Sequence, residues 1–351
     1  MRCALRFLIS VFVSVGGIGC GSDASDDLDR YFRVDPYPNA ACNKVDQRLA
    51  GRRQVRLFFN GVVSVEPVAH GLANYYHRHS LSFFTDAEPR ATTMAYALDT
   101  DMDALMRAAT ANFPGVDLNN DAAFMADPAL YDRLRTFAAN FILKPMVDFA
   151  AAHSEAAGAI TNVIVVPQLE RPGVEKVLSD STKSLAGLAI SPALLAIFAG
   201  SQSEESKIWQ GVQLPSAFSP MMVLGDDVLT NARASAPELQ DLVVAHEFGH
   251  TGALTHTMVE RNLMYPVVRR NIDDCTDSLD DSQLTTVSAN YGLGPAARTA
   301  PLVQRVDAAL PAGPSRILPS FAPDRMRALL AGDRQALRSF VDMLFHGGGP
   351  S

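Results

Sequence analysis

The stretch from Val243 to His256 reads VVAHEFGHTGALTH and gathers three of the chain's eight histidines around one glutamate. His246 and His250 are four residues apart, so on a helix they lie on the same face and can bind one metal ion together. Glu247 follows the first of them, where its carboxylate can reach a metal-bound water without being a ligand. This spacing predicts that zinc lowers the pKa of the water, while the glutamate takes its proton and passes it to a leaving amine.

A third histidine, His256, comes six residues after His250. It is too far along to stay on the same helical face, so the helix must end and the chain must turn back for it to bind. Three histidines give zinc three protein ligands and leave a fourth position open, as in a catalytic site. The alternative is an ordinary helix with surface histidines, and the clustering of three histidines around one glutamate argues against it.

The composition is that of a folded globular protein. The chain has 351 residues, of which 48% are hydrophobic, so it can bury a sizeable core. It carries 38 acidic and 30 basic residues, without the concentrated basic face that nucleic-acid binding needs. Nucleic acid is therefore excluded as the expected partner.

The N-terminus, MRCALRFLISVFVSVGGIGC, has the layout of an export signal. Its apolar run, from Phe7 to about Val15, is too short to span a bilayer permanently. The segment resembles a bacterial lipoprotein signal, in which the cysteine after the cleavage site is lipidated. This implies a signal peptide over 1–19, a lipidated Cys20 with a flexible tether over 20–50, and a membrane-anchored protein in the periplasm or at the cell surface. Ordinary secretion is the alternative.

Two cysteines, Cys42 and Cys275, remain outside the signal and the cleavage site. In an oxidising compartment such a pair predicts a disulfide, with two free thiols as the alternative.

Strands and helices alternate along the chain and predict a layered α/β arrangement around the histidines. A helix is expected to begin at Pro237 and to continue into the histidine motif. Residues 101–155 are expected to be helical, with Asp127 as an N-cap and Pro145 breaking or kinking the helix. Residues 293–351 are expected to form a linker rich in proline and glycine and a helical tail. Strands are expected within 53–65, 81–86, 91–98, 161–169 and 219–229, and a short helix within 66–80.

The segment HEFGHTGALTH resembles the zinc signature HExxHxxGxxH of the metzincins. Downstream, NLMYP is similar to the Met-turn of the matrixin branch, and LDDSQLTTVSANYG resembles the closing helix of matrixin catalytic domains. The resemblance implies an α+β, metzincin-like zincin fold over 51–292, with the helical insertion at about 101–155. Such a fold has a twisted mixed sheet, a long zinc-binding helix and a small irregular C-terminal subdomain.

The same resemblance implies a zinc-dependent endopeptidase that cleaves extended peptides. His246, His250 and His256 would bind one catalytic zinc ion, and Glu247 would be the general base. Met264 would form the floor beneath the metal. An apolar wall would accept the side chain after the scissile bond, and it would consist of Pro266, Val267 and Val268.

This chain departs from the family signature at Ala253, where the family has glycine, and Gly252 stands one place earlier. Two arrangements remain open. Either the helix ends one residue sooner with Gly252 in the left-handed conformation, or Ala253 adopts that conformation at a cost of about 1 kcal/mol.

Other polar groups give weaker predictions. Asp99, Asp101 and Asp103 alternate as calcium ligands would, but they lack the glycine and later glutamate of an EF-hand loop. The pair His77 and His79 predicts a solvated surface more readily than a second metal site.

Three further functions remain as alternatives. Some matrixins are held latent by a propeptide cysteine on the zinc, so Cys42 could act as such a switch, although PNAACNKVD does not match their inhibitory motif. The chain could also be a surface lipoprotein that binds partners on a metzincin scaffold with inert zinc. A third alternative is a zinc hydrolase of a non-peptide amide.

Overall fold

The computed structural model describes residues 28–37, 40–61, 63–97, 102–116, 127–154, 160–169, 186–200, 212–235, 237–265 and 278–294. Its centre is a six-stranded sheet in the order β2-β1-β4-β6-β5, with β3 paired to β1. Only β5 runs antiparallel to its neighbour, at one edge of the sheet. The strands are β1 (Gly51–Asn60), β2 (Leu81–Phe84), β3 (Arg90–Thr92), β4 (Ile160–Val166), β5 (Gly187–Ile190) and β6 (Met221–Gly225).

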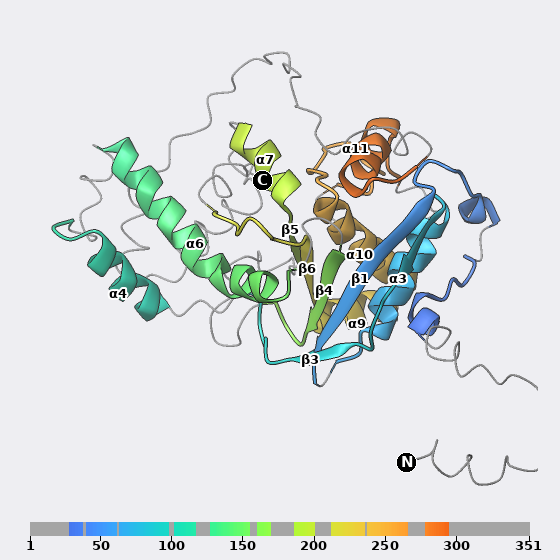
Figure 1. Ribbon diagram of the computed structural model, residues 1–351, viewed down its shortest axis with the longest axis horizontal. Coiled ribbons are helices and arrows are strands. Elements are labelled where there is room, and N and C mark those ends of the chain that lie inside the picture. Colours follow the sequence, from blue (N-terminus) through green and yellow to red (C-terminus); the bar gives the residue numbers. More distant parts are fainter. Residues whose placement is uncertain are drawn as a thin grey trace, which may run out of the picture.

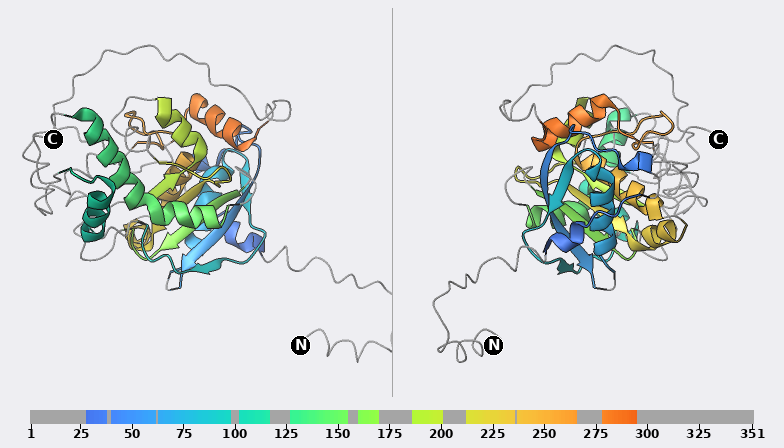
Figure 2. Two further views of the ribbon diagram at one scale, coloured as in Figure 1. Left: turned by 60° about the vertical axis from the view of Figure 1, so that its left-hand side comes forward. Right: turned by 90° about the vertical axis from the view of Figure 1, so that its right-hand side faces the viewer.

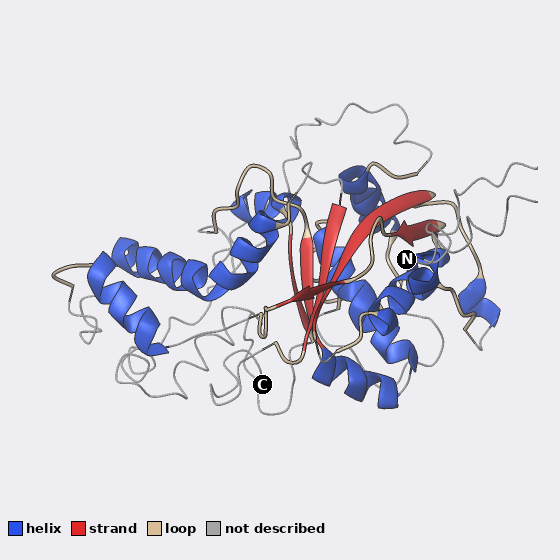
Figure 3. Ribbon diagram, turned by 60° about the horizontal axis from the view of Figure 1, so that its bottom comes forward, coloured by secondary structure: helices blue, strands red, loops and turns tan. Residues whose placement is uncertain are grey.

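Helices cover both faces of this sheet (Figures 1, 2 and 3). One face packs against α3 (Glu66–His77), α9 (Asp226–Ser235) and α10 (Pro237–Thr251), and this side holds the larger core. The other face packs against α6 (Pro128–Ala152) and α7 (Pro192–Gly200). The mixed sheet with a histidine-bearing helix beneath it confirms the predicted metzincin-like fold class. Among the described residues, no helix has both the length and the hydropathy needed to cross a membrane.

Apart from β5, the strands overlap the ranges that the sequence predicts from runs of β-branched and aromatic residues. All seven residues of β4 are buried, as expected for a central strand between two helical layers. The prediction for 219–229 is right for β6, and its paired methionines Met221 and Met222 are fully buried. After Gly225 the chain continues directly into α9, with Asp226 in the first helical turn.

The predicted helical insertion consists of α4 (Met102–Asn112) and α6. Asp127 caps α6 as predicted, since its side chain accepts a hydrogen bond from the backbone amide of Leu130. The helix continues through Pro145 without a break, and Figure 3 shows that its two halves point in different directions. The kink is therefore confirmed, and the alternative of a break is wrong.

Residues 28–37 and 40–50 form an N-terminal strap on the sheet domain, so the prediction of a flexible tether up to residue 50 is wrong for this part. Two short helices shape the strap, η2 (Asp29–Phe32) and η3 (Ala40–Asn43). Tyr31 and Phe32 are buried in the larger core, and the ring of Phe32 stacks on Phe83 of β2 with centroids 6.1 Å apart. Leu49 is fully buried. The strap is thus part of the folded domain.

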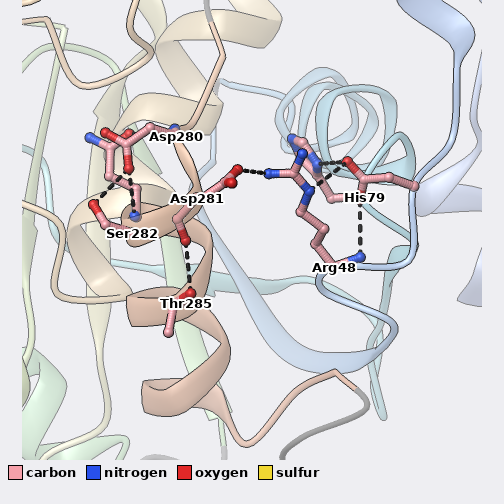
Figure 4. A network of polar contacts seen from close by, with 8 residues as sticks. Arg48, His79, Asp280, Asp281, Ser282 and Thr285 are labelled. Atoms are coloured by element: carbon pink, nitrogen blue, oxygen red, sulfur yellow. Dashed lines mark hydrogen bonds and ion pairs between the residues drawn. The ribbon is translucent and has the colours of Figure 1, made fainter.

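The end of the strap is fixed by charged groups (Figure 4). Asp46 accepts from Nδ1 of His79 at 3.1 Å, and Arg48 pairs with both Asp46 and Asp281 of the closing helix α11 (Asp281–Tyr291). His79 is buried, and burial lowers its pKa. The prediction of a solvated surface is therefore wrong for His79, which has a structural partner, while His77 is exposed.

Candidate metal centre

The first two histidines lie on α10, which begins at Pro237 as predicted. One side of this helix is locked in the core by residues such as Val244 and Phe248, both fully buried. Its opposite side carries His246 and His250 one turn apart, and their Nε2 atoms are 3.1 Å from each other. The helix therefore presents two imidazoles to one point.

The third histidine joins them from the loop that follows. The Nε2 atom of His256 is 3.3 Å from that of His246, and the ligand atoms of all three histidines lie within 4.8 Å of one another. Two nitrogens bound to one tetrahedral zinc ion at about 2.0 to 2.1 Å lie about 3.3 to 3.4 Å apart. The three imidazoles therefore fit one zinc ion.

The other ring nitrogens orient the first two imidazoles. Nδ1 of His246 is 2.6 Å from the carbonyl oxygen of Leu263, and Nδ1 of His250 is 2.7 Å from that of Leu254. A carbonyl oxygen can only accept, so both Nδ1 atoms donate a proton. The Nε2 lone pairs are then free to face the shared point, as a metal site needs.

The electrostatics favour neutral imidazoles. Burial, and then the neighbouring His256, lower the pKa of His246 to about 3. Burial also lowers the pKa of His250 well below its ordinary value. Since a metal binds the neutral ring, no proton has to be displaced from these two side chains at neutral pH.

Glu247 is buried beside this cluster, with 8% of its surface exposed. None of the described residues forms a hydrogen bond to its carboxylate, and burial raises its pKa to about 8. Its side chain fits under β5 because Gly187 has none: a Cβ atom there would be 2.4 Å from Cγ of Glu247. The carboxylate is therefore desolvated and unpartnered within the described chain.

Gly187 and β5 are not predicted by the sequence pattern. The strand has only four residues, all buried, so it shows no alternation of polar and apolar positions. The spacing of a glycine relative to Glu247 carries no signal either, because the contact joins residues sixty positions apart.

The exit from α10 resolves the question at Gly252 and Ala253. Ala253 has a φ of 71°, so it takes the left-handed conformation, and Gly252 does not. The amide of Leu254 donates to Gly249 O at 3.1 Å, and that of Ala253 donates to His250 O at 3.0 Å. These two bonds form a Schellman cap with alanine in the place of the usual glycine.

Gly252 has a different role, which is to allow close packing of the closing helix. A Cβ atom there would lie 3.1 Å from Cγ2 of Val287 and 3.3 Å from Cε2 of Tyr291, both on α11. The early glycine therefore provides room for α11 rather than a left-handed turn.

The Met-turn contains Leu263, whose carbonyl oxygen accepts a hydrogen bond from the imidazole of His246. Met264 is fully buried, with its sulfur against Gly249 of α10. The side chain of Asn262 accepts from the amide of Met264 at 2.8 Å and donates to Gln283 of α11 at 2.8 Å. The turn that bears Leu263 O is thus tied to the closing helix.

Several predicted residues lie outside the described part of the chain. The pocket wall at Pro266, Val267 and Val268 is among them, so its apolar preference stays a prediction. The same holds for lipidation of Cys20 and for the disulfide, because Cys275 is not described. It also holds for calcium binding at Asp99 and Asp101 and for the tail after residue 294.

Comparison with known proteins agrees with this geometry. The matrixin family model matches residues 194–292, a range that contains the zinc helix, the third histidine, the Met-turn and the closing helix. No curated protein matches the chain in sequence. The match and the histidine cluster support a zinc metallopeptidase in general. Residues 194–292 of this chain are therefore similar to matrixins, and their histidine triad matches a metzincin zinc site.

Proposed function

We propose that this protein is a zinc-dependent endopeptidase in which Glu247 is the general base. The observation that carries the proposal is a buried carboxylate, unpartnered within the described chain, next to three convergent imidazoles. A zinc site that serves only the fold does not need such a group, because burying a carboxylate without a partner costs free energy.

His246, His250 and His256 would hold the zinc ion. When bound, zinc supplies a Lewis acid that polarises the scissile carbonyl and lowers the pKa of a water molecule. Glu247 receives a proton from this water and delivers it to the nitrogen of the leaving amine. Burial beneath β5 raises the pKa of Glu247, and the positive charge of a bound zinc ion would favour the ionised carboxylate that accepts this proton.

The edge strand supports an extended peptide as the substrate. Within the described residues β5 pairs only with β6, so its outer backbone groups have no strand partner there. β5 also contacts α10 directly, through Gly187 and Glu247. A peptide added along this edge would run past the general base, with backbone hydrogen bonds fixing its register.

A peptide-library digest tests the proposal, with the wild type compared with Glu247→Ala and zinc measured in both. We expect cleavage at internal bonds by the wild type only, with zinc retained in the variant. Absence of cleavage by both proteins would favour a binding module with inert zinc. Hydrolysis of small amides but not of peptides would favour the non-peptide hydrolase.

We also propose that the protein is exported and anchored by lipid on Cys20. The support is the signal-like sequence before this cysteine. Mass spectrometry of the mature protein is expected to show a lipidated N-terminal cysteine, and an unmodified soluble chain would contradict it.

A further inference from the structure

We infer that Asn290 and Tyr291 of α11 are positioning residues that hold the strained turn at Ala253 and thereby fix the imidazole of His250. The inference rests on the proposed metal site and does not depend on which bond the protein hydrolyses.

The turn at Ala253 has a strained backbone with a direct link to the metal site. Its φ of 71° is a conformation that costs an ordinary L-residue about 1 to 2 kcal/mol. The next residue, Leu254, supplies the carbonyl that accepts from Nδ1 of His250. If Ala253 relaxed to a negative φ, this carbonyl would move and the imidazole would lose its orientation.

Two polar contacts from α11 hold the residues just before the turn. Nδ2 of Asn290 donates to Gly252 O at 3.1 Å. The hydroxyl of Tyr291 is hydrogen-bonded to Oγ1 of Thr251, which in turn donates to Phe248 O at 2.8 Å. The end of the zinc helix is therefore fixed on both of the residues that precede Ala253.

Tyr291 is itself anchored to the sheet. The guanidinium of Arg53, on β1, lies 4.1 Å from the centre of its ring. Arg53 is buried and donates through Nε and Nη2 to Oγ1 of Thr161 on β4, at 3.1 and 2.9 Å. The ring of Tyr291 also contacts the ring of Phe248, with centroids 5.4 Å apart. The contacts of Asn290 and Tyr291 with the end of α10 are called the clamp below. Through Tyr291, this clamp is supported by two central strands, β1 and β4.

A strained residue persists only where its surroundings over-determine its conformation. With alanine at position 253, removal of the clamp lets the turn release its strain, which displaces Leu254 O. With glycine at this position the left-handed conformation carries no such strain, so the turn should keep its shape without the clamp. The clamp and Ala253 should therefore be energetically coupled.

A double-mutant cycle tests this coupling. The double variant Asn290→Ala/Tyr291→Phe removes both polar contacts, together with the contacts of these side chains with Thr161 and Thr286 O, and keeps the aromatic ring. It is made with Ala253 and again with Ala253→Gly, and zinc and cobalt affinities are measured by competition with a chelator. We expect about tenfold weaker metal binding with Ala253, in the range for groups that orient a ligand, and less than about threefold with Ala253→Gly.

Two further measurements separate positioning from general stability. The visible spectrum of the cobalt protein should change in the clamp variant and recover when Ala253→Gly is added, because it reports ligand geometry. Thr285→Ala, on the same helix but bonded only to Asp281 O among the contacts described, should leave affinity and spectrum unchanged.

An equal loss of affinity in both backgrounds, or no loss in either, would overturn the inference. If the double variant does not fold, Tyr291→Phe alone is carried through the same cycle. Metal affinity is measured without peptide, so a failure of the proposed peptidase activity would leave this result unaffected.

Discussion

Two buried carboxylates on α10, Asp241 and Glu247, are treated differently by the surrounding chain. Asp241 accepts hydrogen bonds from the hydroxyl of Tyr37 and from Nδ2 of Asn74, each at 3.1 Å. Burial raises its pKa to about 6, and these two hydrogen bonds oppose the rise. Glu247 accepts none from the described residues, and burial raises its pKa to about 8.

The difference separates a structural acid from the proposed general base. The partners of Asp241 come from the N-terminal strap and from α3, so this carboxylate joins three segments of the fold. Glu247 joins no segments in this way within the described chain. Its raised pKa instead fits the proposed role as general base. Four substitutions test this division, and they are ordered by the size of the expected effect.

Replacing the proposed general base should abolish turnover. Glu247→Gln keeps the size of the side chain but cannot accept a proton, so we expect peptide cleavage to fall by about 10² to 10⁴. Zinc content should stay the same, because the glutamate is not a ligand. Steady-state kinetics and metal analysis measure both quantities, and turnover close to that of the wild type would end its assignment as the base.

Filling the space beside that acid should also reduce turnover. In Gly187→Ala the new Cβ would overlap Cγ of Glu247, so the carboxylate must shift. We expect kcat/KM to fall by about 10- to 100-fold, with zinc still bound. Gly200→Ala is the matched control, because a Cβ there meets no atom within 4 Å. Equal activity of the two variants would show that Glu247 adapts freely.

The structural acid should instead affect stability, in a pH-dependent way. The folded pKa of Asp241 is about 6 against an ordinary 3.8, so the folded state holds this proton more tightly than the unfolded chain does. This contribution to stability is fully present below pH 3.8 and is lost as the pH rises through 6. Asp241→Asn should therefore gain about 3 kcal/mol relative to the wild type between pH 4 and pH 7.

Urea unfolding at a series of pH values measures this difference. Asp148→Asn, at an exposed site paired with Lys144, should show no such trend. A difference between Asp241→Asn and the wild type that does not vary with pH would contradict the raised pKa.

The smallest effect is expected from the partner of the structural acid. Tyr37→Phe removes one donor to Asp241 and should lower the free energy of unfolding by about 1 kcal/mol at pH 7. In the Asp241→Asn background the loss should be smaller, since an amide oxygen is a weaker acceptor than a carboxylate. Additive losses would show that the Tyr37 hydroxyl contributes independently of Asp241.

The helix α10 could be predicted from the sequence because the features that indicate it all lie within one short segment. The four-residue spacing of His246 and His250 places them on one face of any helix, and Pro237 marks where that helix begins. The third ligand, His256, could be predicted only together with a turn, and its local geometry depends on which of two residues takes a positive φ. The structure assigns that conformation to Ala253 because α11 occupies the space beside Gly252.

The remaining features depend on contacts between distant segments. The polar composition after Cys20 predicts a tether, yet Tyr31 and Phe32 are buried in the core together with residues of α3 and β2. Similarly, Gly187 matters only because β5 returns next to Glu247. Periodicity reports burial within one element, so it cannot show which other element covers it.

If Cys20 is lipidated, the N-terminal strap limits the distance between the membrane and the folded domain. The described structure begins at Leu28, eight residues after Cys20. Even fully extended, eight residues reach at most about 29 Å, which is less than the width of many protein domains. An anchored molecule would therefore work only on chains that come close to the membrane surface, and its reach would be shorter than a tether to residue 50 would allow.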